Sequence, residues 1–446
     1  MSLQGCVGAF GSTLGLCKGH NEEIIDSVLL RGPALDLARV SSRTMTKVVP
    51  IRSVVMRGQF RGGTSQPFHA TLVATDASCL RDGVALAASS QPDNRGATRK
   101  SSKRAKTTQD TCAVVTDTPP VILPWIAFGT YLLKESNAEK AVLDAIRAGY
   151  RCIDTAYIYN NGKVEKAVGR AIQKALSTGL VASRKELFII TKQWRKFHGH
   201  DDTIKCFQTS LRRLQLDYID CYLIHWPGPA HRTMNRENAK LEEFGPWHYA
   251  TTTAEDLPRV RGETWRGMET LLAQGTTRSI GVSNFTIQHL ETLRKTAKVW
   301  PPAINQVECH PLYPNNALLE YCAEHGIILQ AYSALGGQDA SKRVWKEIVF
   351  KDEDNPDTTL LECPTVREIA DEVQKTPGQV LLRYAIQRNC AIAMKTTRPV
   401  RMEENAAIFD FTLTPKQMSA LDKLERPNNE GRLCWKREPL RMLDFD

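Results

Sequence analysis

The sequence has 446 residues, of which 42% are hydrophobic and 24% charged. This composition is typical of a globular protein and excludes a collagen-like or wholly disordered chain. We find no apolar run of about 18 residues or more, so we expect no transmembrane helix. The twelve cysteines are scattered and include no Cys-x-x-Cys pair. Their spacing argues against a zinc site or a disulfide framework and favours a reducing compartment.

The net charge of +10 is unevenly distributed along the chain. Residues 1–110 contain 15 Lys and Arg but only 8 Asp and Glu, a net charge of +7. The remaining 336 residues contain 44 basic and 41 acidic residues, a net charge of +3. The basic excess therefore says little about what the rest of the chain binds, and we expect no nucleic acid as a partner.

Residues 1–118 are expected to form a disordered, low-order basic extension with no assigned fold. Their apolar runs are short, and Gly, Ser, Thr and Arg are interspersed without sustained periodicity. The basic segment 99–106 lies in a Ser- and Thr-rich setting, which favours a solvated linker; a nuclear or organelle address and a misassigned gene start are alternatives. Glu22, Glu23 and Asp26 argue against a secretory signal.

From residue 119 to 446, strand-like and helix-like segments alternate. Eight strands are expected, at 125–132, 151–156, 187–194, 218–226, 278–284, 303–308, 327–333 and 390–396. Parallel strands need crossover helices, and eight such units over about 300 residues predict a (β/α)8 TIM barrel, an α/β fold. A doubly wound sheet is the alternative, but no Gly-x-Gly-x-x-Gly follows the first strand.

Several helix ends can be read directly. Gly149 and Gly179 follow apolar helical patterns and suit the position after a helix C-terminus. Three capping boxes predict helix starts: Thr365 with Glu368, Thr376 with Gln379, and Thr414 with Gln417. The last two have proline at the first helical position, which favours a helix start there.

Polar residues follow the expected strands where a barrel places its chemistry, at the C-terminal ends. They are Tyr131, Asp154, Lys192, His225-Trp226, Ser283-Asn284, Gln306, Tyr332-Ser333 and Lys395-Thr396. One polar residue per strand could simply solvate the barrel mouth. The convergence of eight ends, including an acid, an ammonium and an imidazole, favours a catalytic site.

The stretch from Arg151 to Ile172 adds a phenol, because Tyr159 follows Asp154 by five residues and precedes a helical pattern. In isolation this could be an Asp that caps a loop and a Tyr that packs beneath it. A free Tyr has a pKa of about 10, and we expect the Lys192 ammonium to lower it. Asp154 would hold Lys192, and His225 would bond a substrate oxygen. Such a group can protonate the oxyanion that develops when hydride is added to a carbonyl.

These residues resemble the aldo-keto reductase superfamily, specifically its aldose and aldehyde reductases, over residues 119–446. The matching motifs are Gly149–Tyr159, Ile190–Trp194, Ile224–Pro227, Ile280–Phe285, Asn305–Pro311, Ala331–Gly336 and Lys395–Asn405. Jointly they are highly specific. The extension before residue 119 has no counterpart in a typical member of the family.

The resemblance implies roles for individual residues. Asp154, Tyr159, Lys192 and His225 match the catalytic tetrad, with Tyr159 as general acid and His225 also in contact with substrate. Cofactor-binding roles are implied for Thr130, Ser283, Asn284, Gln306, Tyr332, Ser333, Leu335, Gly336, Lys395, Thr396, Thr397, Arg401, Glu404 and Asn405. Tyr131, Trp194 and Trp226 would line the substrate pocket, although Trp226 could instead be a core residue. No metal ligands are implied.

One departure affects the catalytic loop. Val168 and Gly169 follow Tyr159 by nine and ten residues, whereas the family usually has six and seven. About three extra residues lengthen the loop, and Tyr157 is a rival phenol, although the spacing from Asp154 favours Tyr159. His310 is interpreted as structural, and His198 and His200 as loop-surface residues. The tail, residues 426–446, resembles the loop that caps the family's pocket.

The resemblance implies an NADPH-dependent oxidoreductase of the alcohol dehydrogenase (NADP+) or aldehyde reductase type. It would reduce aldehydes, ketones or sugar carbonyls to alcohols. The alternatives are a cofactor-binding regulatory or sensor subunit, and an N-terminal interaction module with a secondary barrel. We expect a cytoplasmic monomer that binds a small carbonyl substrate and no membrane, with organelle or nuclear targeting left open. The substrate is not predicted, because it depends on variable loops near residues 228–261 and 337–363 and on the tail.

Overall fold

The structure is a computed structural model of the 446-residue chain. It describes residues 121–229, 252–337, 359–427 and 430–434, together with the backbone of seven short strands before residue 115. The chain divides into two units, Met1–Arg104 and Ala105–Asp446. In the first unit the described backbone forms three two-stranded antiparallel ladders. They pair β1 (Thr13–Leu14) with β6 (Val84–Ala85), β2 (Leu29–Gly32) with β3 (Leu35–Arg39), and β4 (Val54–Met56) with β5 (Phe68–Ala70).

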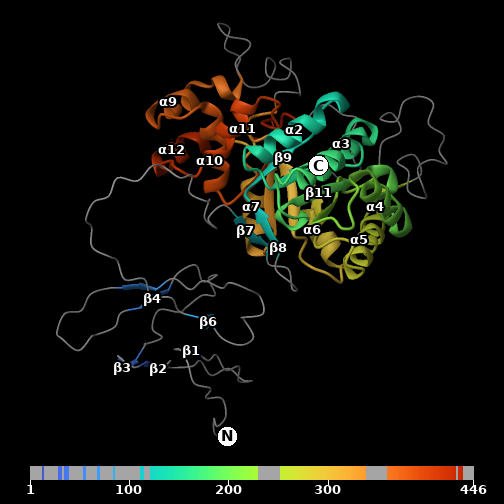
Figure 1. Ribbon diagram of the computed structural model, residues 1–446, viewed down its shortest axis with the longest axis horizontal. Helices are drawn as coiled ribbons and strands as arrows, with labels where there is room; N and C mark the ends of the chain where they lie inside the picture. The colour runs from blue at the N-terminus through green and yellow to red at the C-terminus, as the bar shows by residue number, and fades with distance from the viewer. Residues whose placement is uncertain are drawn as a thin grey trace. The chain divides into compact units, whose positions relative to one another are not determined.

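The second unit contains a closed eight-stranded parallel barrel surrounded by helices, as Figure 1 shows. Its strands are β9 (Ile126–Gly129), β10 (Cys152–Asp154), β11 (Phe188–Gln193), β12 (Cys221–Ile224), β13 (Ile280–Ser283), β14 (Ile304–Glu308), β15 (Ile328–Tyr332) and β16 (Ala391–Met394). They neighbour one another in sequence order, and β16 closes the ring on β9. The predicted (β/α)8 fold is confirmed, and each strand lies within its expected range.

Helices connect the strands. They are α2 (Glu135–Arg147), α3 (Lys163–Ser177), α4 (His200–Leu214), α5 (Leu257–Ala273), α6 (Ile287–Arg294), α7 (Asn316–Glu324), α9 (Pro364–Glu372), α10 (Pro377–Gln387), α11 (Pro399–Ala406) and α12 (Pro415–Asp422). Short 3-10 turns add η2 (Tyr159–Gly162), η3 (Arg184–Glu186), η4 (Arg195–Phe197), η7 (Ala254–Asp256) and η8 (Leu360–Glu362).

The core has two layers, because successive strand residues point to opposite faces. Small and branched side chains such as Ala127, Cys152 and Leu223 pack together in one buried cluster. The alternate strand residues, among them Phe128 and Ile153, pack in a second cluster with apolar residues of the helices. Leu123 joins the first cluster from outside the ring and is fully buried.

Leu123 lies in an antiparallel hairpin that precedes the barrel. Strand β7 (Thr111–Val114) pairs with β8 (Val121–Pro124), which leads into β9. Residue 118, the expected boundary, lies between these two strands. The hairpin belongs to the unit that begins at Ala105.

The helix ends follow the local sequence, with one exception. Gly149 and Gly179 adopt left-handed conformations, with φ of 98° and 68°. Thr376 and Thr414 each accept a hydrogen bond in a capping box at the starts of α10 and α12. The predicted capping role of Thr365 is wrong: α9 already begins at Pro364, where a residue without an N–H costs no hydrogen bond.

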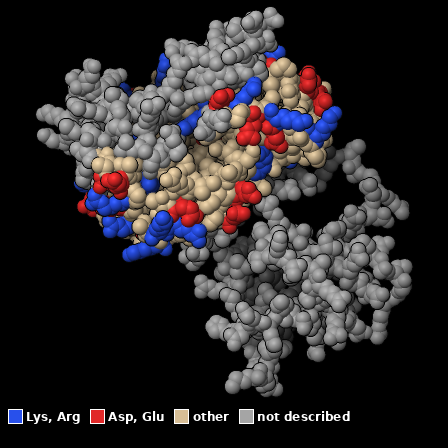
Figure 2. Space-filling view, turned by 180° about the vertical axis from the view of Figure 1, so that it is seen from behind, with Lys and Arg blue, Asp and Glu red and all other residues tan. Residues whose placement is uncertain are grey.

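The surface of the barrel unit carries mixed charge. Figure 2 shows basic and acidic side chains interspersed on one face, rather than gathered by sign. No helix in the described part of the chain is long and apolar enough to span a membrane. The described residues also contain no cluster of His, Cys, Asp and Glu that could hold a metal ion.

Candidate active site

A buried ion pair between Lys192 and Asp154 lies at the C-terminal ends of β10 and β11. The Lys192 ammonium donates hydrogen bonds to both carboxylate oxygens of Asp154 at 2.7 Å and to the carbonyl oxygen of Thr155 at 2.9 Å. Lys192 is fully buried and Asp154 is 4% exposed. Because the strands are parallel neighbours, these two residues, 38 apart in the sequence, meet as the motif predicted.

Two glutamines extend this network across the barrel. The Gln306 amide donates to Asp154 Oδ2 at 2.8 Å and to Gln330 Oε1 at 2.7 Å. The sequence analysis expected Gln306 to bind cofactor and did not identify Gln330. A glutamine between apolar residues in Ile-Leu-Gln-Ala-Tyr was the available signal, since a fully buried amide needs a partner.

Tyr159 stands beside this pair, at the start of η2. Its ring lies 5.3 Å from the Lys192 ammonium, 5.3 Å from the Tyr131 ring and 6.0 Å from the His225 ring, measured to centroids. The rival phenol, Tyr157, instead packs against Phe197 and the guanidinium of Arg213. The structure thus brings Tyr159, and not Tyr157, to the other tetrad residues.

The expectation that Lys192 lowers the pKa of Tyr159 is wrong for this structure. Burial raises the pKa of Tyr159 well above 10, and the charge of Asp154 raises it further. Asp154 and Thr155 already accept hydrogen bonds from the ammonium, which contacts the Tyr159 ring through its face. Burial also lowers the pKa of Lys192, while Asp154 opposes that shift.

His225 supplies a neutral imidazole. Burial, reinforced by the charges of Lys192 and Arg195, lowers the pKa of His225 well below 6.5. Its Nδ1 is buried and has no hydrogen-bond partner among the described residues. A neutral imidazole has one donor and one acceptor nitrogen, so this ring can bond a polar ligand atom without adding a charge to the site.

Aromatic side chains surround His225. The Trp194 ring meets it edge-on at 5.8 Å, and the Trp226 ring is stacked at 6.3 Å. Trp226 is 3% exposed, whereas Tyr131 is 40% exposed. All three residues expected to line a substrate pocket therefore lie close to the imidazole or to Tyr159.

Ser283, Asn284 and Tyr332 form a second polar group across the mouth. The Ser283 hydroxyl donates to the Gln306 carbonyl oxygen at 2.8 Å. The Asn284 amide donates to the His225 carbonyl oxygen at 3.0 Å, and its Oδ1 accepts from the Tyr332 hydroxyl at 2.8 Å. Asn284 has a left-handed backbone, with φ of 63°. These three of the four residues expected around a nicotinamide are thus linked to one another, to the fourth, Gln306 on β14, and to the backbone at His225.

The loop after β15 carries Ser333, Leu335 and Gly336, which were expected along a pyrophosphate. Ser333 and Gly336 have positive φ, 54° and 86°, and the Gly336 N–H closes a turn on the Ser333 carbonyl at 2.7 Å. Leu335 packs against the second core cluster, which lies between the strands and the helices. The Ser333 hydroxyl lies 3.2 Å from the Cys434 sulfur, so the tail reaches this loop.

Exposed cations follow β16. Lys395, Arg398 and Arg401 are exposed, and no carboxylate of the described residues pairs with them. Thr396 accepts a bond from the Arg398 N–H at 3.2 Å, and Thr397 is exposed. Helix α11 begins among them at Pro399. Free cations beside a helix N-terminus fit the phosphate group that the sequence predicted here.

The remaining expected cofactor contacts are less exposed. Asn405 is 6% exposed on α11, and the Glu404 carbonyl oxygen accepts a bond from Gln379. Thr130 is fully buried, and its hydroxyl donates to the Asp154 carbonyl oxygen at 2.9 Å. In this structure the hydroxyl of Thr130 therefore links β9 to β10.

The C-terminal tail is attached to the barrel by Glu308. Its carboxylate accepts from the N–H groups of Leu433 and Cys434 at 2.6 to 3.0 Å and from His310 Nε2 at 3.0 Å. His310 is buried here, as its structural interpretation requires. The surface interpretation of His198 is wrong: it is 1% exposed and lies 3.0 Å from Thr264 Oγ1. Burial lowers its pKa to about 3.

Comparison with known proteins agrees with this geometry. Residues 126–426 match the model of the Aldo/keto reductase family. Aldo-keto reductase family 1 member A1 of Sus scrofa is 34% identical over 304 residues, which cover 68% of this chain and 86% of that protein. The protein of the same name from Homo sapiens is 35% identical over the same coverage.

Two solved structures are similar as well. The aldo/keto reductase of Brucella melitensis has 33% identity and a TM-score of 0.55, and the match covers 70% of this chain and 99% of that one. The Bombyx mori aldo-keto reductase in complex with NADP has 32% identity and a TM-score of 0.58, with coverages of 72% and 94%. With its parallel barrel and the polar cluster at its mouth, this chain belongs to the aldo/keto reductase family.

Proposed function

We propose that this protein reduces small aldehydes and ketones to alcohols with NADPH, and that Tyr159 is the general acid. The observation that carries the proposal is the convergence of Asp154, Lys192, Tyr159 and His225 at the C-terminal ends of the barrel strands. The Bombyx mori relative was solved with NADP, which supports the same cofactor class here.

The raised pKa of Tyr159 has a direct chemical consequence. The phenol remains protonated at neutral pH, so each turnover begins with the acid in the form that can donate. When bound, the reduced nicotinamide supplies the hydride that goes to the carbonyl carbon. Tyr159 then gives its proton to the carbonyl oxygen. The phenolate that remains takes a proton back from solvent, while the Lys192 ammonium, 5.3 Å from the ring centroid, stays paired with Asp154.

His225 would orient the substrate. A neutral imidazole can donate one hydrogen bond to a carbonyl oxygen without adding a charge to the site. Its position 6.0 Å from the Tyr159 ring centroid allows both groups to reach the same oxygen. Tyr131, Trp194 and Trp226 would enclose the apolar part of the substrate.

The residues around the mouth would hold the cofactor. Ser283, Asn284 and Gln306 offer amide and hydroxyl groups at the level of Tyr332, whose ring would stack on the nicotinamide. The exposed cations Lys395 and Arg401 would bond the 2′-phosphate that distinguishes NADPH from NADH.

Replacement of Tyr159 by Phe tests the acid. It removes one hydroxyl and leaves the ring contacts, so turnover of a generic aldehyde should fall by about 10²–10⁴-fold. NADPH binding, followed by fluorescence quenching, should stay within twofold. The matched control is Tyr157→Phe, whose ring faces Arg213 and should change turnover far less. A larger loss for Tyr157→Phe than for Tyr159→Phe would contradict the assignment.

A further inference from the structure

The loop that carries Tyr159 has an uncommon backbone conformation. After Tyr159 come Asn160, Asn161 and Gly162, which all have left-handed backbones with φ of 47°, 52° and 80°. Asn and Gly enter this region more readily than other residues, but they do so as single residues rather than in a row. The loop has about three residues more than the family pattern, so an external support is expected.

Arg213, near the end of α4, provides such a support. Its Nη1 donates to the Tyr157 carbonyl oxygen at 3.1 Å and pairs with Glu165 Oε2 at 3.1 Å. Its guanidinium also covers the Tyr157 ring at 4.2 Å. A Cβ atom on Gly162 would collide with this guanidinium, so the loop approaches Arg213 as closely as glycine permits.

The same contacts lead to the catalytic lysine. The Tyr157 N–H donates to the Lys192 carbonyl oxygen at 3.1 Å, while Arg213 holds the Tyr157 carbonyl. Glu165 is fully buried and accepts from the Thr191 hydroxyl at 2.8 Å, one residue before Lys192. Arg213 therefore bonds both ends of the segment that contains Tyr159, and that segment is bonded to β11.

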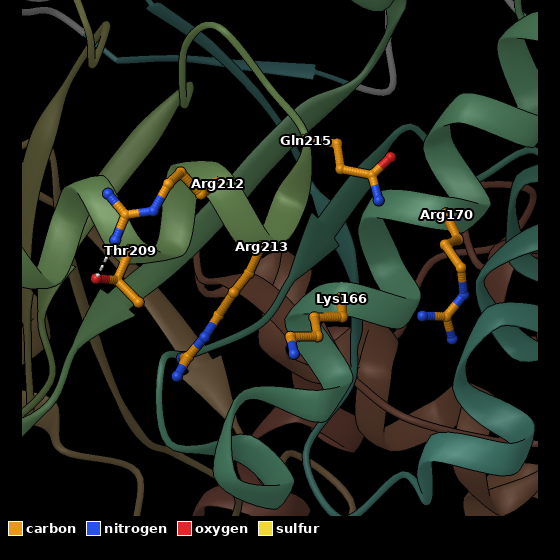
Figure 3. A pocket seen from close by; sticks show the side chains of 6 residues that line it. All are labelled: Lys166, Arg170, Thr209, Arg212, Arg213 and Gln215. Atoms are coloured by element: carbon orange, nitrogen blue, oxygen red, sulfur yellow. Dashed lines mark hydrogen bonds between the residues drawn. The ribbon is translucent and has the colours of Figure 1, made fainter.

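Arg213 differs from the other cations around it. It lines a surface cavity between α3 and α4 together with Lys166, Arg170, Arg212, Thr209 and Gln215. Figure 3 shows that Arg212 turns back to Thr209, where a hydrogen bond of 3.0 Å holds it, whereas Arg213 extends in another direction. Arg170 is paired with Glu139 at 2.9 Å. Of the arginines in this cavity, Arg213 is the one bonded to the catalytic loop.

We propose that Arg213 is a positioning residue that holds the lengthened loop so that Tyr159 stays beside Lys192 and His225. This inference rests on the proposed role of Tyr159 as general acid. Loss of Arg213 would let the loop leave its left-handed conformation, and Tyr159 would spend less time within reach of the substrate oxygen. The residues expected to bind cofactor, which lie at the end of β9, on or after β13 to β16 and on α11, make none of these contacts.

The test compares Arg213→Met with Arg212→Met in the full chain. For Arg213→Met we expect kcat for a generic aldehyde to fall about 10- to 100-fold, while the Kd for NADPH stays within twofold. The primary deuterium isotope effect with deuterated NADPH should increase, because the chemical step becomes slower relative to product release. Arg213→Lys, which keeps a donor and a charge, should recover part of the loss. Arg212→Met should stay within twofold of wild type.

A double variant separates this inference from the proposed function. If Arg213 acts through Tyr159, then Arg213→Met should change kcat less than twofold in a Tyr159→Phe background. An equal loss in both backgrounds, or an unchanged kcat for Arg213→Met, would overturn the positioning role. Should Tyr159→Phe itself retain full activity, the proposed acid is wrong, whatever the Arg213 variants do. Arg213→Lys keeps the test decisive if Arg213→Met does not fold.

Discussion

The two sides of the barrel mouth differ in how they hold charge. On one side Asp154 and Lys192 are buried and bonded to each other, to Thr155 and to Gln306. On the other side Lys395, Arg398 and Arg401 are exposed and have no carboxylate partner among the described residues. The first arrangement holds its own charges in place. The second leaves positive charge available to a ligand.

This difference has energetic consequences. Removal of one partner from a buried ion pair leaves an uncompensated charge, whereas exposed cations can be removed at little cost to folding. Salt also screens buried charge much less than exposed charge, which is screened over about 10 Å at 0.1 M salt. The buried side should therefore govern stability and chemistry, and the exposed side should govern cofactor affinity.

The largest expected effect is on the buried side. Lys192→Met should lower the free energy of unfolding by about 3–5 kcal/mol, because Asp154 is left buried without its cation. Urea denaturation measures this loss. The double variant Asp154→Asn/Lys192→Met should lose less stability than Lys192→Met alone, because it removes both charges and keeps an acceptor for Gln306. Lys140→Met, at an exposed pair with Asp144, is the control and should not shift the urea midpoint. Equal urea midpoints for Lys192→Met and the wild type would contradict a stabilising ion pair between Lys192 and Asp154.

The exposed side should determine cofactor choice. Arg401→Met removes a charge-assisted hydrogen bond of about 1.5–3 kcal/mol, so NADPH should bind about ten- to a hundredfold more weakly. The Kd for NADH should stay nearly the same, and the unfolding midpoint should not move. Rising salt should weaken NADPH binding more than NADH binding in the wild type. Equal losses for the two cofactors, or a wild-type preference for NADH, would refute the phosphate site.

Acid should lower the stability of the fold. His198 is 1% exposed and His225 is half-buried, and desolvation holds their folded pKa values below the usual 6.5. The unfolded chain takes up protons near pH 6.5 that the folded chain does not, so stability is lost as pH falls below that value. The expected loss is about 1.4 kcal/mol per pH unit for each histidine. Urea curves at pH 7.5 and 5.5 check this, and His198→Gln should reduce the slope more than His200→Gln. Identical slopes in both variants would contradict it.

The smallest effect is expected from the N-terminal extension. A chain that begins at Asp110 keeps the β7–β8 hairpin and should retain turnover and its unfolding midpoint. A chain that begins at Trp125 loses Leu123, a fully buried side chain whose burial contributes about 1.5–3 kcal/mol. The chain that begins at Trp125 should therefore unfold at a lower urea concentration than the chain that begins at Asp110. An inactive Asp110 chain beside an active full chain would disprove the division into units.

Local sequence rules predicted most of the elements. The eight strands, the glycines at 149 and 179 and two of the three capping boxes could be read from short segments, because each depends on nearby residues. Thr365 failed as a cap because Pro364 offered a better helix start. The buried position of His198 was not visible, because Thr264 lies 66 residues away.

The sequence by itself determined the barrel and named the residues at its mouth, since strand ends in a parallel barrel converge whatever the loops do. The tertiary structure decided how those residues interact. It turned Tyr157 toward Arg213 and Tyr159 toward His225, and it raised the pKa of Tyr159 by burial. It also joined Gln330 to the network and placed Arg213 against the catalytic loop. Burial and contacts between distant strands and helices set these features, and no short segment of sequence contains them.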